Sequence, residues 1–375
     1  MLKAKLTRNY ILAVPMLIVV ELLRVAGAEA SSCSWQNKSP RPVGTAATLL
    51  TIAPISANNV WAAGWATQKD GGDVLFEHFD GASWQTYPPP TLHLNAYAFG
   101  LSATSSTDVW SVGSQTNQGG GAAPLIMHWN GASWIVSPNP EGSANGMLSN
   151  VVAFSKHLAF AAGEINESGT FHPIVERFDG ANWKLSNVFD PENDAEFQAI
   201  SGTGVNDLWA GGYQNGGSEP LIEKYDPAKD SWVEMQQGAR DYIYSLSARS
   251  SNDVWASGPE TGPPYIEHWN GSFWSPVKFS PGASAVLEQV NASDPSGYTW
   301  ATGWRPSGEK FVAFSDRYYA GKWERTDPVR VGAISTTPFA IAPLLGSNKV
   351  WVVGSYRNTS LEMPLAEVAT CSVEQ

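Results

Sequence analysis

The feature that most constrains this chain is a repeat of 45–51 residues built around an aromatic position. The aromatic residue recurs seven times, at spacings of 49, 50, 49, 46, 45 and 51 residues, as Trp61, Trp110, Phe160, Trp209, Trp255, Trp300 and Trp351. A glycine follows each of them three residues later, and a second tryptophan follows six of them after 19 to 24 residues. Such self-similarity indicates a repeat architecture, in which each unit packs on its neighbours.

Each repeat contains four short apolar runs separated by turn residues. The fourth repeat shows them at 197–201, 207–212, 221–225 and 231–235. Four short strands in a unit of this size are typical of a propeller blade. A helical solenoid is excluded because no repeat has a long apolar stripe of helical period, and 35 glycines and 25 prolines would interrupt one.

The predicted fold is therefore all-β: one domain, residues 31–375, that forms a seven-bladed β-propeller of four-stranded antiparallel blades. We place the blades at about 47–89, 96–140, 148–190, 197–237, 242–280, 286–328 and 338–371, with 33–40 completing the last blade.

The two ends of the repeat array look like one hairpin cut at its turn. In register with the second repeat, residues 364–369 align with 124–129, and Cys33 aligns with Ala132. The N-terminal segment is thus predicted to supply the outermost strand of the last blade. A disulfide between Cys33 and Cys371 would rejoin the cut, and a lone reactive thiol is the weaker alternative.

Turn residues recur at two places in each repeat. Asp-Gly or Asn-Gly pairs link the third and fourth strands in four repeats, and they favour tight hairpins. An aromatic residue precedes each hairpin and is expected to pack on the tryptophan that follows it. Asp108, Asp207 and Asp253 lie between the first and second strands, where we interpret them as structural turn caps.

The N-terminus has the layout of a secretory signal peptide, which we assign to residues 1–28. Lys3, Lys5 and Arg8 precede an apolar run at 11–20, and small residues follow at 26–28. An uncleaved anchor helix is the alternative, but ten clean apolar residues are few for a bilayer. We expect a secreted or extracytoplasmic protein, in the periplasm or at the cell surface.

Charge narrows the choice of partners. The chain carries 23 Lys+Arg and 35 Asp+Glu, and cleavage after Ala28 removes four basic residues and one acid, which leaves 19 against 34 and a net charge of −15. Such a surface repels phosphate, so we expect neither nucleic acid nor, after signal cleavage, a membrane as partner. A glycan or protein ligand and a monomeric state are expected.

The repeats resemble known propeller families. The fourth carries Gly211, Gly212, Tyr225 and Trp232, which is similar to a kelch repeat. The chain from 33 to 371 resembles bacterial secreted propellers with Asp-Val-Trp-Ala-Val-Gly and Trp-Asn-Gly-x-x-Trp units, of the kelch and galactose-oxidase-like class. This resemblance implies the fold and leaves the function open. The copper site of galactose oxidase is not carried over, because both cysteines are explained by the closure.

No catalytic constellation is recognisable, and we predict no catalytic residue, no metal and no cofactor. The chain has no Gly-x-Ser-x-Gly elbow, no His-Glu-x-x-His and no phosphate loop. An acidic-then-basic pair recurs on the third strands, as Glu77-His78, Glu176-Arg177, Glu223-Lys224, Glu267-His268 and Asp316-Arg317. We interpret these residues as charge pairs within or between blades rather than as an axial cluster.

Aromatic and polar residues gather where the second strands end. The candidate ligand-binding residues are Trp65, Tyr213, Trp304, Tyr356, Arg305, Arg357 and Glu164. Blade-to-blade links on the same face add Tyr97, Tyr242 and Tyr244. Exposed rings beside amides and charged groups suit a sugar or a polar peptide. The alternative is that these rings pack on their neighbours or fill the central channel.

The function predicted from the sequence is a secreted, non-enzymatic binding module that engages glycan or protein through this variable-loop face. The alternative is an extracellular carbohydrate-active enzyme, a hydrolase or lyase, with its site at the channel mouth. It would require two carboxylates about 5 to 10 Å apart, for which Glu164 with Asp70 or Glu196 are the candidates. A purely structural or adhesive role is a third hypothesis.

Overall fold

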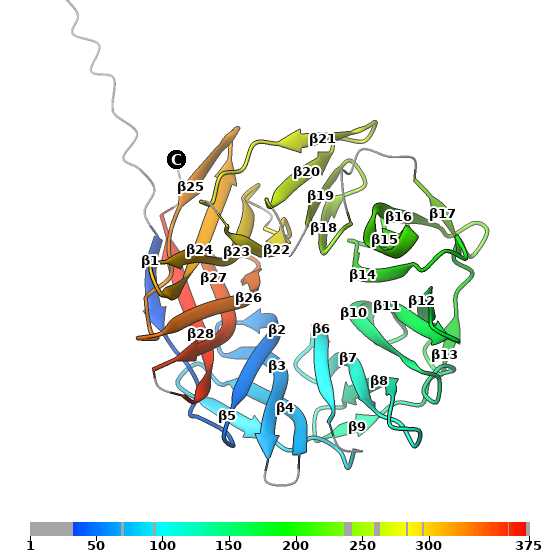
Figure 1. Cartoon of the computed structure of the whole chain (residues 1–375), viewed down its shortest axis with the longest axis horizontal. Helices are drawn as coiled ribbons and strands as arrows, with labels where there is room; N and C mark the ends of the chain where they lie inside the picture. Colours follow the sequence, from blue (N-terminus) through cyan, green and yellow to red (C-terminus); the bar gives the residue numbers. More distant parts are fainter. Residues whose placement is uncertain are drawn as a thin grey trace, which may run out of the picture. The chain divides into compact units, whose positions relative to one another are not determined.

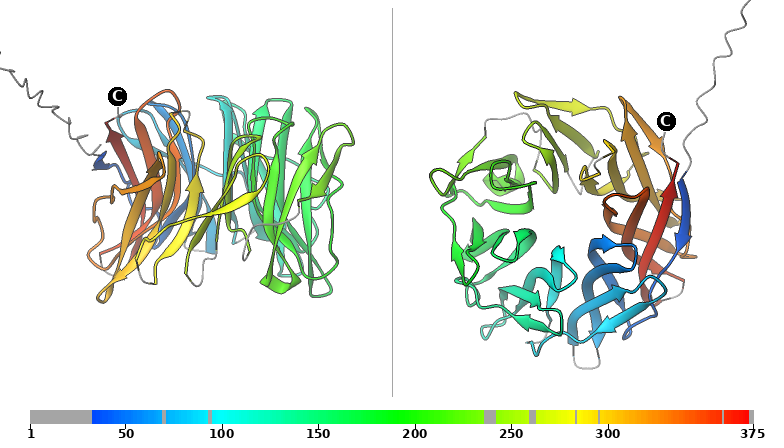
Figure 2. Two further views of the ribbon diagram at one scale, coloured as in Figure 1. Left: turned by 90° about the horizontal axis from the view of Figure 1, so that it is seen from above. Right: turned by 180° about the vertical axis from the view of Figure 1, so that it is seen from behind.

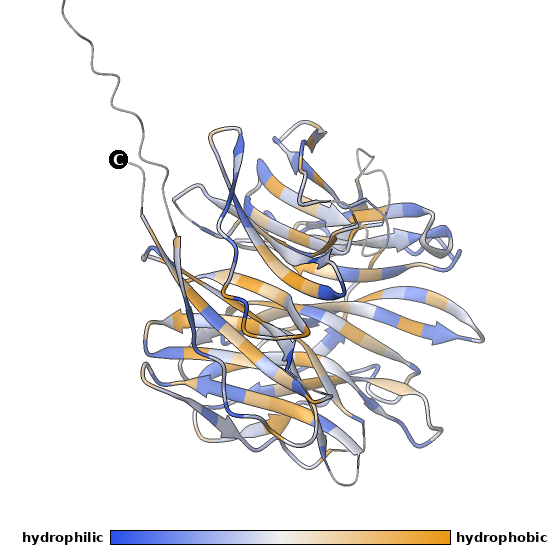
Figure 3. Ribbon diagram, turned by 60° about the vertical axis from the view of Figure 1, so that its left-hand side comes forward, coloured by the Kyte–Doolittle hydropathy of each residue, from blue (hydrophilic) through white to orange (hydrophobic). Residues whose placement is uncertain are grey.

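A computed structural model describes residues 33–372, except 69–70, 93–94, 236–241, 259–262, 283, 295 and 359. This part of the chain is all-β, as predicted, with a single 3-10 turn at Asn215–Gly217. Hydrophobic and hydrophilic residues alternate along many of the strands (Figure 3), as expected where successive side chains point to opposite faces. The predicted signal peptide, 1–28, lies outside the described residues.

Five separate sheets each contain four consecutive strands in antiparallel order. The first comprises β2 (Ala47–Ser56), β3 (Asn59–Gln68), β4 (Gly71–Phe79) and β5 (Trp84–Tyr87). The second comprises β6 (Tyr97–Ser105), β7 (Asp108–Thr116), β8 (Ala122–Trp129) and β9 (Trp134–Val136). The third comprises β10 (Gly146–Ser155), β11 (Leu158–Glu167), β12 (Thr170–Phe178) and β13 (Trp183–Leu185). The fourth comprises β14 (Glu196–Ser201), β15 (Trp209–Gln214), β16 (Glu219–Asp226) and β17 (Ser231–Glu234). The fifth comprises β18 (Ser245–Ser250), β19 (Asp253–Gly258), β20 (Tyr265–Trp269) and β21 (Trp274–Val277).

A sixth sheet has eight strands and consists of two antiparallel runs. One run comprises β22 (Val286–Asn291), β23 (Thr299–Ser307), β24 (Lys310–Tyr319) and β25 (Lys322–Arg325). The other comprises β26 (Ser335–Pro343), β27 (Lys349–Arg357), β28 (Glu362–Cys371) and β1 (Cys33–Asn37). A single parallel pair, Phe311 with Ser335, joins the two runs.

The first strand of every run lies innermost. Each contacts the first strand of the next run, from β2 to β6 and onward through β10, β14, β18, β22 and β26, and β26 contacts β2. Figure 1 shows these strands around a common centre, and Figure 2 shows the same ring from above and from behind. The innermost strands therefore form a closed ring.

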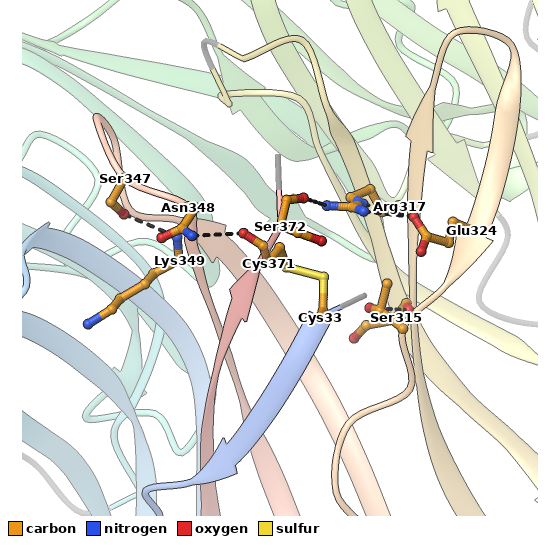
Figure 4. The surroundings of a disulfide bond; sticks show 10 residues. Cys33, Ser315, Arg317, Glu324, Ser347, Asn348, Lys349, Cys371 and Ser372 are labelled. Carbon is orange, nitrogen blue, oxygen red and sulfur yellow. Dashed lines mark hydrogen bonds and ion pairs between the residues drawn. A yellow bond between two sulfur atoms is a disulfide. The ribbon is translucent and has the colours of Figure 1, made fainter. Parts of the chain in front are cut away.

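The ends of the chain meet as the sequence predicted. β1 pairs with β28 antiparallel, with Cys33 opposite Cys371, and a disulfide joins these two residues (Figure 4). Asn348 Nδ2 donates to the Cys371 carbonyl at 2.8 Å, and the buried Arg317 donates to the Ser372 carbonyl at 3.4 Å and to Glu324 at 2.7 Å. Residues of β24 and of the turn between β26 and β27 thus make polar contacts around the disulfide.

The recurring aromatic residues form the packing between neighbouring runs. The ring centre of Trp61 on β3 lies 5.0 Å from that of Trp129 and 5.4 Å from that of Trp134. These two tryptophans flank the hairpin between the third and fourth strands of the next sheet. Trp351 on β27 contacts Phe79 and Trp84 in the same way, at 5.1 and 5.7 Å, and so links the last run to the first. Edge-on aromatic contacts of this kind stabilise by about 0.5–1.5 kcal/mol beyond area burial.

The repeated glycine is explained by a β-bulge on the neighbouring innermost strand. In six of the seven innermost strands the register slips by one residue opposite this glycine, for example between Leu49 and Thr51 of β2. A Cβ added at Gly64 would lie 2.0 Å from the Thr48 carbonyl oxygen. The corresponding distances at Gly113, Gly163, Gly212, Gly258, Gly303 and Gly354 are 1.9 to 2.2 Å. No other residue fits at this position.

We therefore expect Gly113→Ala to lower the free energy of unfolding by about 3 kcal/mol, because its Cβ would clash with a backbone carbonyl that the bulge fixes. Gly204→Ala is the matched control, since a Cβ there has no atom within 4 Å. Urea unfolding of the three proteins checks this expectation. Equal stability of the Gly113 and Gly204 variants would show that the bulge does not require glycine.

Candidate functional site

Six bulged residues of the innermost strands, and one residue that directly precedes β18, line one cavity at the centre of the ring. They are Leu50, Phe99, Ser149, Gln198, Tyr244, Glu288 and Phe339. Tyr244 occupies the equivalent place just before β18, where its N–H bonds the Ser257 carbonyl. The cavity measures about 320 Å³, within the usual range for ligand sites. A bulge redirects one side chain out of the ladder, and in six of the seven innermost strands that side chain lines the channel.

The cavity wall is divided into two arcs of opposite polarity. Phe339, Leu50 and Phe99 come from consecutive runs and form a mainly apolar arc, which Met147 and Ala340 extend. This arc also contains Thr51, whose hydroxyl oxygen accepts the Leu101 N–H. The opposite arc is mainly polar and also comes from consecutive runs, with Ser149, Asn150, Gln198, Tyr244, Ser245, Glu288 and Gln289, and with Leu246 as its apolar member. Among the described residues that line the cavity, none is Lys, Arg or His.

The polar arc is held in place by hydrogen bonds behind it. Trp304 Nε1 donates to Glu288 Oε1 at 2.8 Å, and Gln198 Nε2 donates to Glu196. Gln289 Oε1 accepts the Ile341 N–H at 2.6 Å. These bonds leave the amide oxygen of Gln198 and the amide nitrogen of Gln289 for other partners. The Ser149 hydroxyl is buried with no hydrogen-bond partner in the described part of the chain.

The innermost edge of the ring is sealed by side chains of the preceding run. Each innermost strand pairs on one side only, so alternate N–H groups on the other side need partners. Thr51 Oγ1 accepts the Leu101 N–H at 3.1 Å, and Ser102 Oγ accepts the Ala153 N–H at 2.9 Å. Ser201, Ser245, Ser247 and Gln289 do the same for Ala248, Val290, Ala292 and Ile341.

The aromatic residues predicted from the sequence lie behind the cavity wall. Trp65 packs edge-on against Tyr97 of the next sheet, with ring centres 6.1 Å apart. Tyr213 contacts Tyr242 in the same manner at 5.9 Å, and Trp304 contacts Phe311 at 4.7 Å. All three rings are half-buried. They support the wall and the contacts between runs, which was the alternative that the sequence left open.

The remaining candidates lie nearer the strand ends. Tyr356 is half-buried on β27, opposite Thr336 and Met363. Arg305 pairs with Asp327 at 3.2 Å, and Arg357 pairs with Glu362 at 3.0 Å. Both guanidinium groups are thus engaged within the fold.

Glu164 and Glu196 are brought together, as an acid pair requires. Both are buried, on β11 and on β14 of the next sheet. Burial and the charge of Glu196 raise the pKa of Glu164 to about 9. Burial also raises the pKa of Glu196, against hydrogen bonds from Gln198 and Tyr213, and burial together with Glu196 raises the pKa of the Tyr213 hydroxyl. Neither carboxyl lines the cavity.

Some third-strand residues form the charge pairs that the sequence suggested, such as Asp316 with Arg325 at 3.4 Å, but three buried acids there have another role. Glu176 accepts the Glu141 N–H, Glu223 accepts the Phe189 N–H at 3.1 Å, and Glu367 accepts the Val329 N–H at 2.8 Å. Each donor belongs to the link that enters that run, so these fully buried carboxyls anchor the links. The neighbouring basic residues pair elsewhere, for example Arg177 with Asp230 and His268 with Asp253.

The turn aspartates are structural, as predicted. Asp108 accepts from Thr104 and His128, and Asp207 accepts from Thr203. Asp253 pairs with Arg249 and accepts from Trp255 Nε1 at 2.7 Å. In the described part of the chain, no three His, Cys, Asp or Glu residues are grouped so that they could hold a metal ion. No helix there is long and apolar enough to span a membrane.

A sequence signal for the cavity lies at a fixed distance from the repeated glycine. The seven lining residues stand 14 or 15 positions before this glycine, each directly after a residue that is apolar in every repeat. Their identities range from leucine to glutamate, whereas the glycine never varies. A variable residue at a fixed place in a constant repeat is the mark of a site, and the missing information was that a bulge turns it inward.

Comparison with known proteins supports the fold class. No family model matches the chain, and no curated protein does. Among solved structures, YCF48 bound to D1 peptide matches with a TM-score of 0.58 at 14% identity, covering 90% of this chain and 96% of that one. YCF48 from Cyanidioschyzon merolae matches with 0.58 at 15% identity, covering 90% and 98%. The Cps50 (Swd1) β-propeller domain from Myceliophteria thermophila matches with 0.58 at 9% identity, covering 90% and 100%.

Identities this low show the fold alone. Together with the ring of repeated four-stranded units, they establish that the chain is a β-propeller.

Burial of the link-anchoring carboxyls predicts a pH dependence of stability. The pKa values of Glu176, Glu223 and Glu367 are raised to about 8, chiefly by burial. Because the folded pKa exceeds the ordinary value, the stabilisation is complete below about pH 4.5 and is lost as the pH rises through 8. Each group contributes a slope of up to about 1.4 kcal/mol per pH unit in that window.

We therefore expect the melting temperature to fall from pH 5.5 to pH 9, and Glu367→Gln to reduce this fall. Glu309→Gln, at an exposed turn, serves as the control and should leave the profile unchanged. Thermal melts across the pH range make the comparison. A melting temperature that rises toward pH 9 would contradict burial as the main cause of the raised pKa values of these carboxyls.

Proposed function

We propose that this chain is a secreted seven-bladed propeller that binds a polypeptide segment in its central cavity, without catalysis. Seven blades follow if the eight-stranded sheet is counted as two blades joined by one parallel residue pair. The blades then correspond to residues 47–89, 96–140, 148–190, 197–237, 242–280, 286–328 and 338–371 with 33–40, in a domain of 31–375.

The observation that carries the proposal is the contrast between a constant scaffold and a variable lining. Tryptophan, glycine and hairpin residues recur from blade to blade, whereas the seven residues that face the cavity differ in size and polarity. A channel that served only to close the ring would be filled by similar apolar side chains. Convergent polar groups beside an apolar wall are typical of a ligand site.

In this proposal, the residues that the sequence predicted to bind the ligand support the cavity wall instead. Trp304 orients Glu288, and Tyr213 orients the Glu196 and Gln198 pair. Trp65 and Tyr356, with Arg305 and Arg357, flank the strand ends above the cavity, where a longer ligand would continue. Glu164 lies behind the wall at the blade interface.

Three further observations support the proposal. A polypeptide is favoured over a glycan because one structural neighbour is described as bound to a peptide. Secretion is supported by the layout of residues 1–28 and by the disulfide, since such bonds persist in oxidising compartments. The net charge of −15 expected after signal cleavage keeps nucleic acid an unsuitable ligand.

A hydrolase is the second candidate, favoured by one observation: Glu164 and Glu196 lie together with raised pKa values. One protonated and one ionised carboxyl is the arrangement that acid catalysis needs. We rank it second because both side chains are at least nine-tenths buried and neither faces the cavity. A substrate in the channel would not reach them.

The test is a selection from a displayed peptide library with the mature chain, residues 29–375, run in parallel with a glycan array. We expect peptides to be enriched and to bind at least about tenfold more weakly to Ser149→Tyr, which places a ring in the cavity. Ser133→Tyr, on an exposed hairpin, should bind as the wild type does. Enrichment of glycans alone, or binding that Ser149→Tyr leaves intact, would refute polypeptide binding in the cavity.

A further inference from the structure

We propose that the cavity recognises one uncharged apolar residue of its polypeptide ligand, taking the side chain on the apolar arc and the backbone amide of the same residue on the polar arc. This inference rests on the proposed function and names the part of the ligand that the channel selects. It follows from how the two arcs are arranged and from which polar groups remain available.

The apolar arc provides a continuous surface for a side chain. Phe339, Leu50 and Phe99 belong to three successive innermost strands, so no polar blade interrupts them. Phe99 is backed by Tyr97, with the two rings parallel and 6.0 Å apart. A large aliphatic or aromatic side chain laid on this surface loses most of its contact with water.

Apart from Glu288, the polar arc offers both donors and acceptors in neutral form. The amide oxygen of Gln198 accepts and the amide nitrogen of Gln289 donates. A peptide group needs this combination, because it presents one N–H and one C=O.

Charge decides against an ionic side chain. An acidic residue would meet Glu288 and no cation, since none of the described lining residues is Lys, Arg or His. A basic residue would place its stem on the apolar arc, and its head would give up water for a wall whose one acid, Glu288, is buried and already accepts from Trp304 Nε1. Transferring an ion into such a wall is costly. An uncharged residue avoids both costs.

The size of the cavity agrees with one anchoring residue. A volume of about 320 Å³ is at the low end of the range for ligand sites, and the lining comes from all seven innermost strands. The rest of the ligand would then extend over the loops at the ends of the second strands.

The experiment starts from a peptide selected by the wild-type chain and replaces each of its residues in turn by Leu, Phe, Lys, Glu and Ala. We expect one position at which Leu or Phe binds at least about tenfold more tightly than Lys, Glu or Ala. N-methylation of the backbone nitrogen at that position should also weaken binding about tenfold, because it removes the donor that the Gln198 oxygen accepts.

Two variants connect this preference to the cavity. Phe99→Ala should reduce the advantage of Phe over Ala at the anchor position, whereas Phe273→Ala, at an exposed phenylalanine on a hairpin, should not. Both variants are compared with the wild type by thermal melting, so that a loss of folding is recognised. A charged residue preferred at the anchor, or a preference that Phe99→Ala leaves unchanged, overturns this inference while polypeptide binding stands. If no peptide is selected at all, the proposed function fails and the inference fails with it.

Discussion

Closure of the ring depends on hydrogen bonds to the inner-edge backbone N–H groups of its innermost strands, which no neighbouring strand can bond. An open strand edge invites pairing with another chain, and the inner edge of each run faces the central channel. Serine, threonine and glutamine oxygens of one run accept the N–H groups of the next, as Ser102 does for Ala153 at 2.9 Å. These bonds take the place of strand pairing for the N–H groups that have no acceptor within the sheet. They also connect neighbouring runs near the axis.

The bulge and the repeated glycine convert that scaffold into a site. Opposite each bulge the neighbouring strand has no room for a Cβ, so the glycine is required in every repeat, and the bulged residue is free to vary. Stability and recognition are therefore carried by different positions of the same strands. The tryptophans that pack between runs and the carboxyls that anchor the links keep the ring rigid, which places the seven lining side chains with little conformational freedom.

Much of the fold could be predicted from the sequence because repeats reveal packing. The aromatic and glycine periods, the Asp-Gly and Asn-Gly hairpins and the pairing of Cys33 with Cys371 follow from comparing repeats within one chain. Comparing repeats shows that the residue 14 or 15 positions before the glycine varies, but the direction of its side chain could not be predicted, since a bulge is a backbone irregularity without its own sequence motif. Trp65 and Tyr213 were expected to be exposed, but they contact the next blade, which is invisible without three-dimensional placement. The role of the buried third-strand acids could not be predicted either, because their partners are backbone N–H groups of links that are distant in the sequence.

A cavity with a fixed lining requires that the inner-edge N–H groups stay bonded to the preceding run, and hydrogen exchange resolved to single amides tests this most directly. The N–H groups of Leu101, Ala153 and Ala248 bond to side-chain oxygens of the preceding run. We predict that they exchange as slowly as amides paired within the sheets, and that Ser102→Ala accelerates Ala153 selectively. Rapid exchange of these amides in the wild-type chain would mean that the channel wall is open to water and that the cavity has no fixed lining.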